Sequence, residues 1–135
     1  MIHPHSLLIL VSLAILVFFL ATGVGVARVR RLHGLHAPAM TGHDQVERAI
    51  RVQANTLEWL PLILLTMWFF YVYFGQVIPA VLGVVWIIGR IIYWAGYMRS
   101  PKNRELGFFI QGFPVLILLL GSIFGAARAF LALGG

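Results

Sequence analysis

The sequence predicts an all-α fold, a four-helix bundle embedded in a membrane, and three observations lead to this class. Of the 135 residues, 61% are hydrophobic, whereas only ten are basic and four acidic. Soluble domains carry roughly 25% charged residues. The apolar residues gather in four long segments, and the connections between these segments are short. The length fits one unit, a single transmembrane domain over residues 1–135.

The first apolar segment, residues 6–27, contains no charged residue. At about 1.5 Å per residue, a helix of this length crosses the roughly 30 Å core of a bilayer. Residues 1–5 carry no Lys or Arg, and the segment is longer than the apolar part of a signal peptide. We therefore expect a retained membrane helix.

Three further helices are expected over residues 44–75, 79–100 and 106–130. The second begins before its apolar part, because Asp44 followed by Glu47 resembles a capping box, with Asp44 as the cap. Pro79 suits a first helical turn. Pro101 removes a backbone hydrogen bond, so we expect a kink or a helix end near Ser100.

Basic residues flank the first and third connections, whereas the second connection has none. The positive-inside rule then places these two basic connections in the cytoplasm and both termini on the opposite side. Orientation and contact with anionic headgroups account for the net charge of +6, so no nucleic-acid partner is expected.

Two ordered polar stripes go beyond what orientation requires. On the second helix, Arg48, Arg51, Asn55 and Glu58 share one face, and Gln53 points nearly the opposite way. On the third helix, the shared face carries Arg90, Tyr93 and Tyr97, and it includes Arg104 if the helix continues that far.

Arg90 lies inside an apolar stretch, so it should face the bundle interior, where Glu58 is its expected partner. Arginine forks suit carboxylates, and a buried Glu suits an ammonium group. The two stripes together therefore complement a small, zwitterionic, peptide-like ligand. The alternative is that Glu58 and Arg90 form only a buried ion pair and that the other arginines only anchor the topology.

The residues of these stripes resemble those of the MAPEG family, the membrane-associated proteins in eicosanoid and glutathione metabolism. The resemblance rests on residues 47–61, ERAIRVQANTLEWLP, and residues 90–100, RIIYWAGYMRS. It covers nearly the whole chain and is closest to the microsomal glutathione transferase and leukotriene C synthase branches. It implies a homotrimer that binds glutathione between subunits near the cytoplasmic face.

Residue by residue, the resemblance implies glutathione contacts at Arg51, Asn55, Glu58, Tyr93 and Tyr97, beside Arg90. Gln53 would reach the glutathione of the adjoining subunit, and Arg30 or Arg31 would lie near the ligand. Arg104 would be catalytic, facing the glutathione sulfur. Trp59, where relatives often have Tyr, flanks the expected site, and Pro101 could shift Arg104.

The implied activity is that of a detoxifying transferase. Glutathione would be the co-substrate that brings the thiol, and it would be activated as a thiolate. The thiolate would be conjugated to hydrophobic electrophiles or would reduce lipid hydroperoxides. We expect the protein in a bacterial inner membrane. The alternative within the family is a non-catalytic lipid-binding scaffold. A multidrug exporter is disfavoured because residues 6–27 contain no acid. No metal site is expected, since the chain has no cysteine and only Asp44 lies close to His33, His36 and His43.

Overall fold

The computed structural model describes residues 3–134 as four long helices and one short 3-10 turn. The elements are α1 (Ser6–His33), α2 (Asp44–Phe74), α3 (Val77–Arg99), η1 (Pro101–Arg104) and α4 (Glu105–Leu133). All four α-helices are long and apolar enough to cross a bilayer. The predicted all-α membrane bundle is therefore confirmed, and the protein is an integral membrane protein.

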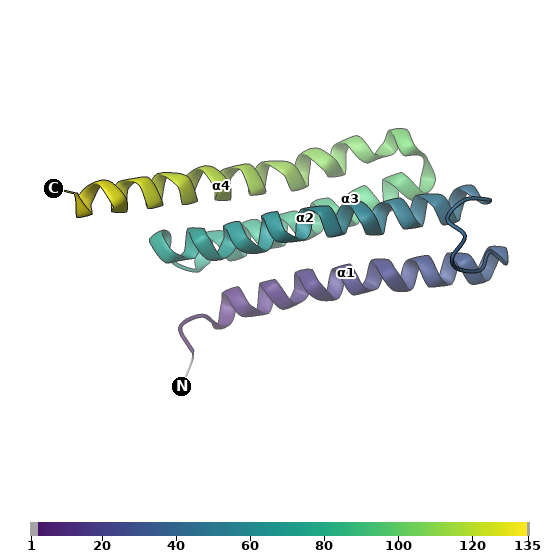
Figure 1. Cartoon of the computed structure of the whole chain (residues 1–135), viewed down its shortest axis with the longest axis horizontal. Coiled ribbons are helices and arrows are strands. Elements are labelled where there is room, and N and C mark those ends of the chain that lie inside the picture. Colours follow the sequence, from purple (N-terminus) through teal and green to yellow (C-terminus); the bar gives the residue numbers. More distant parts are fainter. Residues whose placement is uncertain (1–2, 135) are drawn as a thin grey trace.

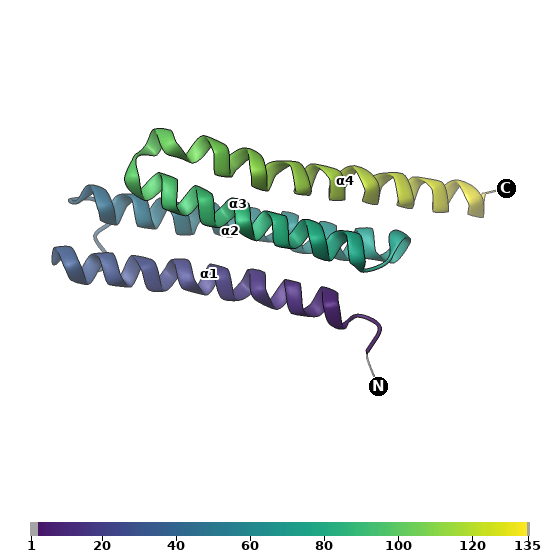
Figure 2. The same cartoon turned by 180° about the vertical axis from the view of Figure 1, so that it is seen from behind.

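The helices lie side by side along the long axis of the molecule (Figures 1 and 2). The α1–α2 loop and the α3–η1–α4 connection lie at one end of the bundle. Both termini and the tight α2–α3 turn lie at the other end. The two connections flanked by arginines thus share one end, called the basic end below.

Both ends of the α1–α2 loop differ from the sequence-based expectation. α1 continues past Ala27 to His33 and stops at Gly34, whose positive φ of 64° lets its N–H bond to Arg30 O. The cap of α2 is His43 rather than Asp44, because the extended backbone at His43 places its Nδ1 where it accepts from Gln45 N at 3.2 Å. Glu47 still reaches back, accepting from Gly42 N at 3.0 Å.

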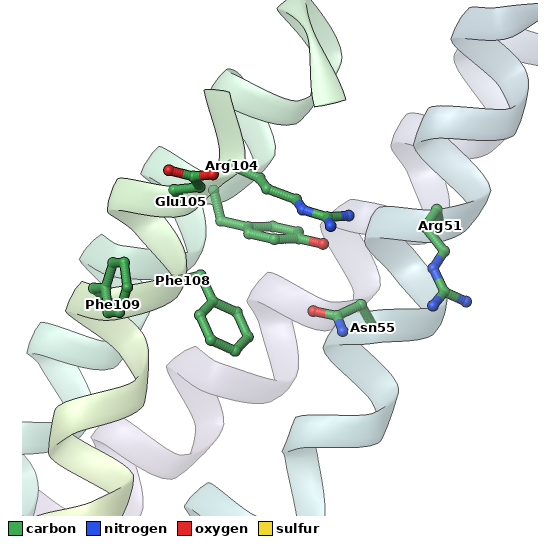
Figure 3. A pocket seen from close by; sticks show the side chains of 7 residues that line it. Arg51, Asn55, Arg104, Glu105, Phe108 and Phe109 are labelled. Atoms are coloured by element: carbon green, nitrogen blue, oxygen red, sulfur yellow. The ribbon is translucent and has the colours of Figure 1, made fainter. Parts of the chain in front are cut away.

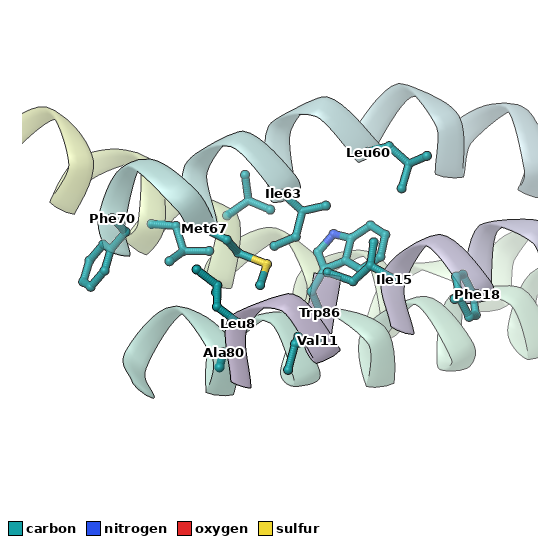
Figure 4. Packing of buried hydrophobic residues seen from close by; sticks show 12 residues of the cluster. Leu8, Val11, Ile15, Phe18, Leu60, Ile63, Met67, Phe70, Ala80 and Trp86 are labelled. Carbon is teal, nitrogen blue, oxygen red and sulfur yellow. The ribbon is translucent and has the colours of Figure 1, made fainter. Parts of the chain in front are cut away.

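The hydrophobic core runs along the bundle axis, and each helix contributes residues at helical spacing (Figure 4). The four helices supply Leu8, Val11, Ile15 and Phe18; Leu60, Ile63, Met67 and Phe70; Ala80 and Trp86; and Val115 and Leu118. Many other large apolar side chains are exposed on the single chain. In a bilayer, lipid or neighbouring subunits cover such faces, and close packing holds the helices together.

α3 and α4 approach each other closely at Gly107 on α4 and at Gly89 on α3. A Cβ atom added at Gly89 would lie 2.6 Å from Gln111 N, which is closer than real side chains tolerate. The absence of a side chain at Gly89 therefore brings α4 against α3 next to Arg90. This contact sets up the polar network beneath the candidate site.

Candidate active site at the basic end

A cavity of about 520 Å³ opens near the basic end of the bundle (Figure 3). Its lining comes from α2, α3, η1 and α4, and consists of Arg51, Asn55, Tyr93, Arg104, Glu105, Phe108 and Phe109. The structure thus brings together four of the residues expected in the site. One wall is polar and cationic, and the other carries two aromatic rings.

On α2, Arg51 and Asn55 reach the cavity because they stand one helical turn apart. Asn55 Nδ2 donates to Glu58 Oε2 at 3.2 Å, which extends the stripe one more turn. Glu58 itself is exposed and does not line the cavity. The polar stripe predicted on α2 therefore forms, with Glu58 at its outer end.

Arg90 is fully buried beneath the cavity, as expected for an arginine inside an apolar stretch. Its Nη1 donates to Asn55 Oδ1 at 2.8 Å and to Gln111 Oε1 at 2.9 Å. Its Nη2 donates to Thr56 Oγ1 at 2.6 Å and to Val52 O at 3.3 Å. One guanidinium thus links α3 to α2 and α4.

The expected ion pair between Arg90 and Glu58 is wrong. Among residues 3–134, the only ion pair within 4.0 Å joins Arg48 and Asp44. Asn55 Oδ1 and Thr56 Oγ1 already occupy the side of the guanidinium that faces α2, and Glu58 lies exposed beyond Asn55. Glu58 reaches Arg90 only indirectly, through the Asn55 amide.

Stacked aromatic rings connect the buried network to Arg104. The rings of Tyr93 and Tyr97 stack with their centroids 5.7 Å apart. Arg90 Cζ lies 4.2 Å from the centroid of Tyr93, and Arg104 Cζ lies 5.7 Å from that of Tyr97. Both contacts have cation–π geometry, so the rings hold two cations at defined places.

Pro101 ends α3 in the way the sequence predicts. α3 stops at Arg99, Ser100 is extended, and Pro101 starts the short turn η1, which carries Arg104 to the cavity wall. Arg48 Nη1 donates to Met98 O and Arg99 O, both at 3.1 Å. Arg48 thus caps the end of α3, a role that its place on the polar stripe did not reveal.

The remaining expected residues lie outside the cavity of the single chain. Gln53 faces α1, since a Cβ atom added at Gly23 would lie 3.1 Å from its Nε2. Arg30 donates from Nη1 to Ala39 O at 2.6 Å, and Arg31 is exposed. Trp59 packs edge-on against Phe108, with ring centroids 6.0 Å apart.

Sequence reasoning missed several residues that build this site. Gln111 and Thr56 bind Arg90, while Glu105, Phe108 and Phe109 line the cavity. Gln111 offered a signal, because it is a polar side chain within the long uncharged stretch of α4, residues 106–127. Phe108 and Phe109 gave none, since they resemble the many lipid-facing residues around them.

The loop histidines stack rather than converge on an ion. The rings of His33 and His43 lie 3.6 Å apart and nearly parallel. Within residues 3–134, no three His, Cys, Asp or Glu residues come together as a metal site requires. The absence of a bound metal stays a prediction.

Chemically, the cavity is suited to an anionic ligand with an apolar neighbour. Arg51 and Arg104 provide forked donors at its wall, and the Asn55 amide can donate or accept. Phe108 and Phe109 provide apolar surface within the same cavity. These groups fit a small peptide carboxylate together with a hydrophobic second molecule.

Comparison with known proteins identifies the family. The sequence model of the MAPEG family matches residues 6–124. The chain belongs to the MAPEG family. An uncharacterized protein of Synechocystis is 39% identical to this MAPEG chain over 105 residues, which are 78% of the chain and 77% of that protein.

Two groups of named relatives also match this MAPEG chain. Human microsomal glutathione S-transferase 2 is 39% identical over 114 residues, which cover 84% of the chain and 76% of that enzyme. Leukotriene C4 synthase of Cavia porcellus is 35% identical over 106 residues, covering 78% and 71% respectively. The resemblance inferred from residues 47–61 and 90–100 is thus confirmed, and both stretches lie within the matched part.

Proposed function

We propose that this MAPEG protein is a membrane-bound glutathione transferase that conjugates glutathione to hydrophobic electrophiles from the bilayer. The observation that carries the proposal is the cavity where Arg51, Asn55, Tyr93 and Arg104 meet beside two phenylalanine rings. Similarity to a glutathione S-transferase and to leukotriene C4 synthase supports it. A lipid-binding scaffold would have no need of this cationic wall.

In this proposal, the polar wall recognises the peptide. Arg51 binds a glutathione carboxylate through its fork of donors, and Asn55 bonds a peptide amide. Glu58, linked to Asn55 at 3.2 Å, accepts from the ligand's ammonium group. Tyr93 and Tyr97 support the ligand through their ring faces and hydroxyls, with Arg90 fixing Asn55 from below.

Arg104 is the proposed catalytic residue, acting on the glutathione sulfur. A free thiol has a pKa of about 8.5 and is only a few per cent thiolate at neutral pH. Lowering that pKa by about two units requires roughly 2.7 kcal/mol of preference for the anion, which a nearby guanidinium can supply. The thiol proton goes to water.

The thiolate then attacks an electrophile held against the aromatic wall. A carbon–sulfur bond forms, and the leaving group departs with the electron pair of the bond that breaks. With a lipid hydroperoxide, the sulfur instead attacks the peroxide oxygen and releases an alcohol. A second glutathione then completes the disulfide, and water is the other product. Phe108 and Phe109 favour apolar substrates in either reaction.

The proposed assembly is a homotrimer in a bacterial inner membrane, with the basic end in the cytoplasm. Gln53 and Arg30 or Arg31 lie away from the cavity of their own chain. In a trimer, they would complete the glutathione site of the adjoining subunit. The positive-inside rule supports the orientation, because the two arginine-flanked connections share one end.

The test compares Arg104→Ala with Arg128→Ala, which removes an arginine side chain from α4, outside the cavity. For Arg104→Ala we expect glutathione binding by calorimetry within about threefold of wild type. Turnover of chlorodinitrobenzene should fall by roughly tenfold or more, since one cation is worth about two pKa units. The thiolate absorbance in the ultraviolet should vanish.

Arg128→Ala should leave all three readouts unchanged. Full turnover by Arg104→Ala would remove Arg104 from catalysis. Absence of glutathione binding and of thiolate absorbance in the wild-type protein would contradict the proposed function and favour the scaffold. A lipid hydroperoxide assayed in parallel would show which of the two reactions dominates.

A further inference from the structure

Glu105 is the acidic residue in the wall of the candidate cavity, and the proposed chemistry does not use it. It is the first residue of α4 and directly follows Arg104. It lies where the cationic part of the lining meets Phe108 and Phe109. Its charge therefore lies between the polar wall of the cavity and the wall formed by Phe108 and Phe109.

The carboxylate of Glu105 has no cationic partner in the described part of the chain. The only ion pair within 4.0 Å among residues 3–134 joins Arg48 and Asp44. Figure 3 shows the Glu105 carboxylate pointing away from the Arg104 guanidinium, on the side of Phe109. The side chain is exposed, so its charge acts on whatever enters the cavity from that side.

A helix N-terminus favours a negative charge, and this electrostatic preference explains why an acid is tolerated at the start of α4. It does not explain the effect of that acid on the cavity. In the proposed complex, one of the two glutathione carboxylates offsets Arg51 and the thiolate offsets Arg104. Glu105 is then the uncompensated charge that the second substrate meets beside the phenylalanine rings.

We propose that Glu105 determines substrate specificity by discriminating against electrophiles that carry a carboxylate near the reacting carbon. Neutral apolar electrophiles would be accepted against Phe108 and Phe109, whereas carboxylate-bearing ones would be repelled. This inference rests on the proposed function and names the class of its second substrate. Two like charges several ångströms apart in a partly wet site change a rate by about three- to tenfold.

The experiment uses two electrophiles that react by the same displacement of chloride, a chlorodinitrobenzoate and its neutral methyl ester. The full-length protein in neutral detergent is assayed for kcat/KM with saturating glutathione. Wild type should prefer the ester after correction for the uncatalysed rates. Glu105→Gln keeps the shape of the side chain and removes its charge.

For Glu105→Gln we expect kcat/KM for the benzoate to rise about three- to tenfold, and that for the ester to change less than twofold. The matched control is Glu47→Gln, which makes the same substitution at an exposed acid outside the cavity. It should leave the ratio of the two substrates unchanged. High salt should shrink the difference between wild type and Glu105→Gln, because the interaction is electrostatic.

An unchanged ratio in Glu105→Gln would overturn the inference, as would an equal fall for both substrates, which a helix-stabilising role alone would produce. Both outcomes leave the proposed function standing, because the ester is still conjugated. Failure of wild type to conjugate either substrate or to bind glutathione would instead overturn the proposed function itself, and this inference with it.

Discussion

Arg90 carries a positive charge into the bundle interior, where Nη1 and Nη2 donate only to neutral acceptors and the buried Nε has no partner among the described residues. Its four hydrogen bonds reach Asn55, Thr56, Gln111 and the Val52 carbonyl. The bond from Arg90 fixes the orientation of the Asn55 amide, because Oδ1 must face the guanidinium. The Nδ2 group therefore points to Glu58. Arg90 therefore positions the polar wall without lining the cavity itself.

Replacing Arg90 by Lys should loosen this wall. Lysine keeps the charge but lacks the planar fork that bonds several acceptors at once. Losing one or two buried bonds costs about 1–3 kcal/mol, so we expect a lower melting temperature and about tenfold weaker glutathione binding. Thermal unfolding in detergent and calorimetry measure the two effects. Arg28→Lys, on an exposed position of α1, should change neither. Wild-type affinity in Arg90→Lys would contradict the positioning role.

At the scale of elements, the join between α3 and α4 determines where Arg104 lies. α3 ends at Arg99, and η1 turns the chain within four residues. α2 holds this join, because Arg48 bonds Met98 O and Arg99 O, and Gln45 Nε2 bonds Met98 O at 3.3 Å. The second helix thus supplies both Arg51 and Asn55 of the cavity wall and the support for η1, the turn that carries the proposed catalytic residue.

Removing the cap should separate binding from turnover. Arg48→Ala leaves Arg99 O without its side-chain donor and leaves Met98 O with Gln45 alone. The loss should destabilise the folded position of η1 by about 1–1.5 kcal/mol. We expect turnover to fall about tenfold while glutathione affinity changes less than threefold, since Arg51 and Asn55 stay in place. Hydrogen exchange over residues 98–105 should quicken.

The control for this variant is Arg99→Ala, because the Arg99 side chain is exposed and the cap uses only its carbonyl. Both its turnover and its hydrogen exchange should match wild type. Equal losses of affinity and turnover in Arg48→Ala would show that Arg48 acts on the whole site rather than on η1.

For the whole molecule, periodicity in the sequence predicts more of the fold than of the contacts. Apolar length gives the four helices, and helical spacing places Arg51 and Asn55 on one face. The partner of Arg90 depends on how far α2 and α4 are shifted and rotated against α3. Gly89 permits the close approach of α4 to α3. The pattern of residues within one helix does not reveal how that helix is placed against its neighbours. The sequence therefore suggested Glu58, whereas packing selects Asn55 and Gln111.

Caps and turns show the same limit on a smaller scale. Pro101 acts mainly through its own backbone, so the end of α3 could be predicted from the sequence. The cap at His43 depends on how the loop approaches α2 and on the ring of His33 stacking against it. Local residue preferences do not predict such contacts between distant parts of the chain.

In the proposed trimer, each site needs residues from two subunits, because Gln53 would contact the glutathione bound to a neighbouring subunit. Gln53→Ala and Arg104→Ala should each lose most turnover alone. When equal amounts of the two variants are coexpressed, about a quarter of all sites combine an intact Arg104 with an intact Gln53 from the neighbouring subunit. Roughly that share of the activity should return. Arg51→Ala with Arg104→Ala, both in the cavity of one chain, should recover nothing. Equal recovery in both mixtures, or none in the first, would contradict a site shared between subunits.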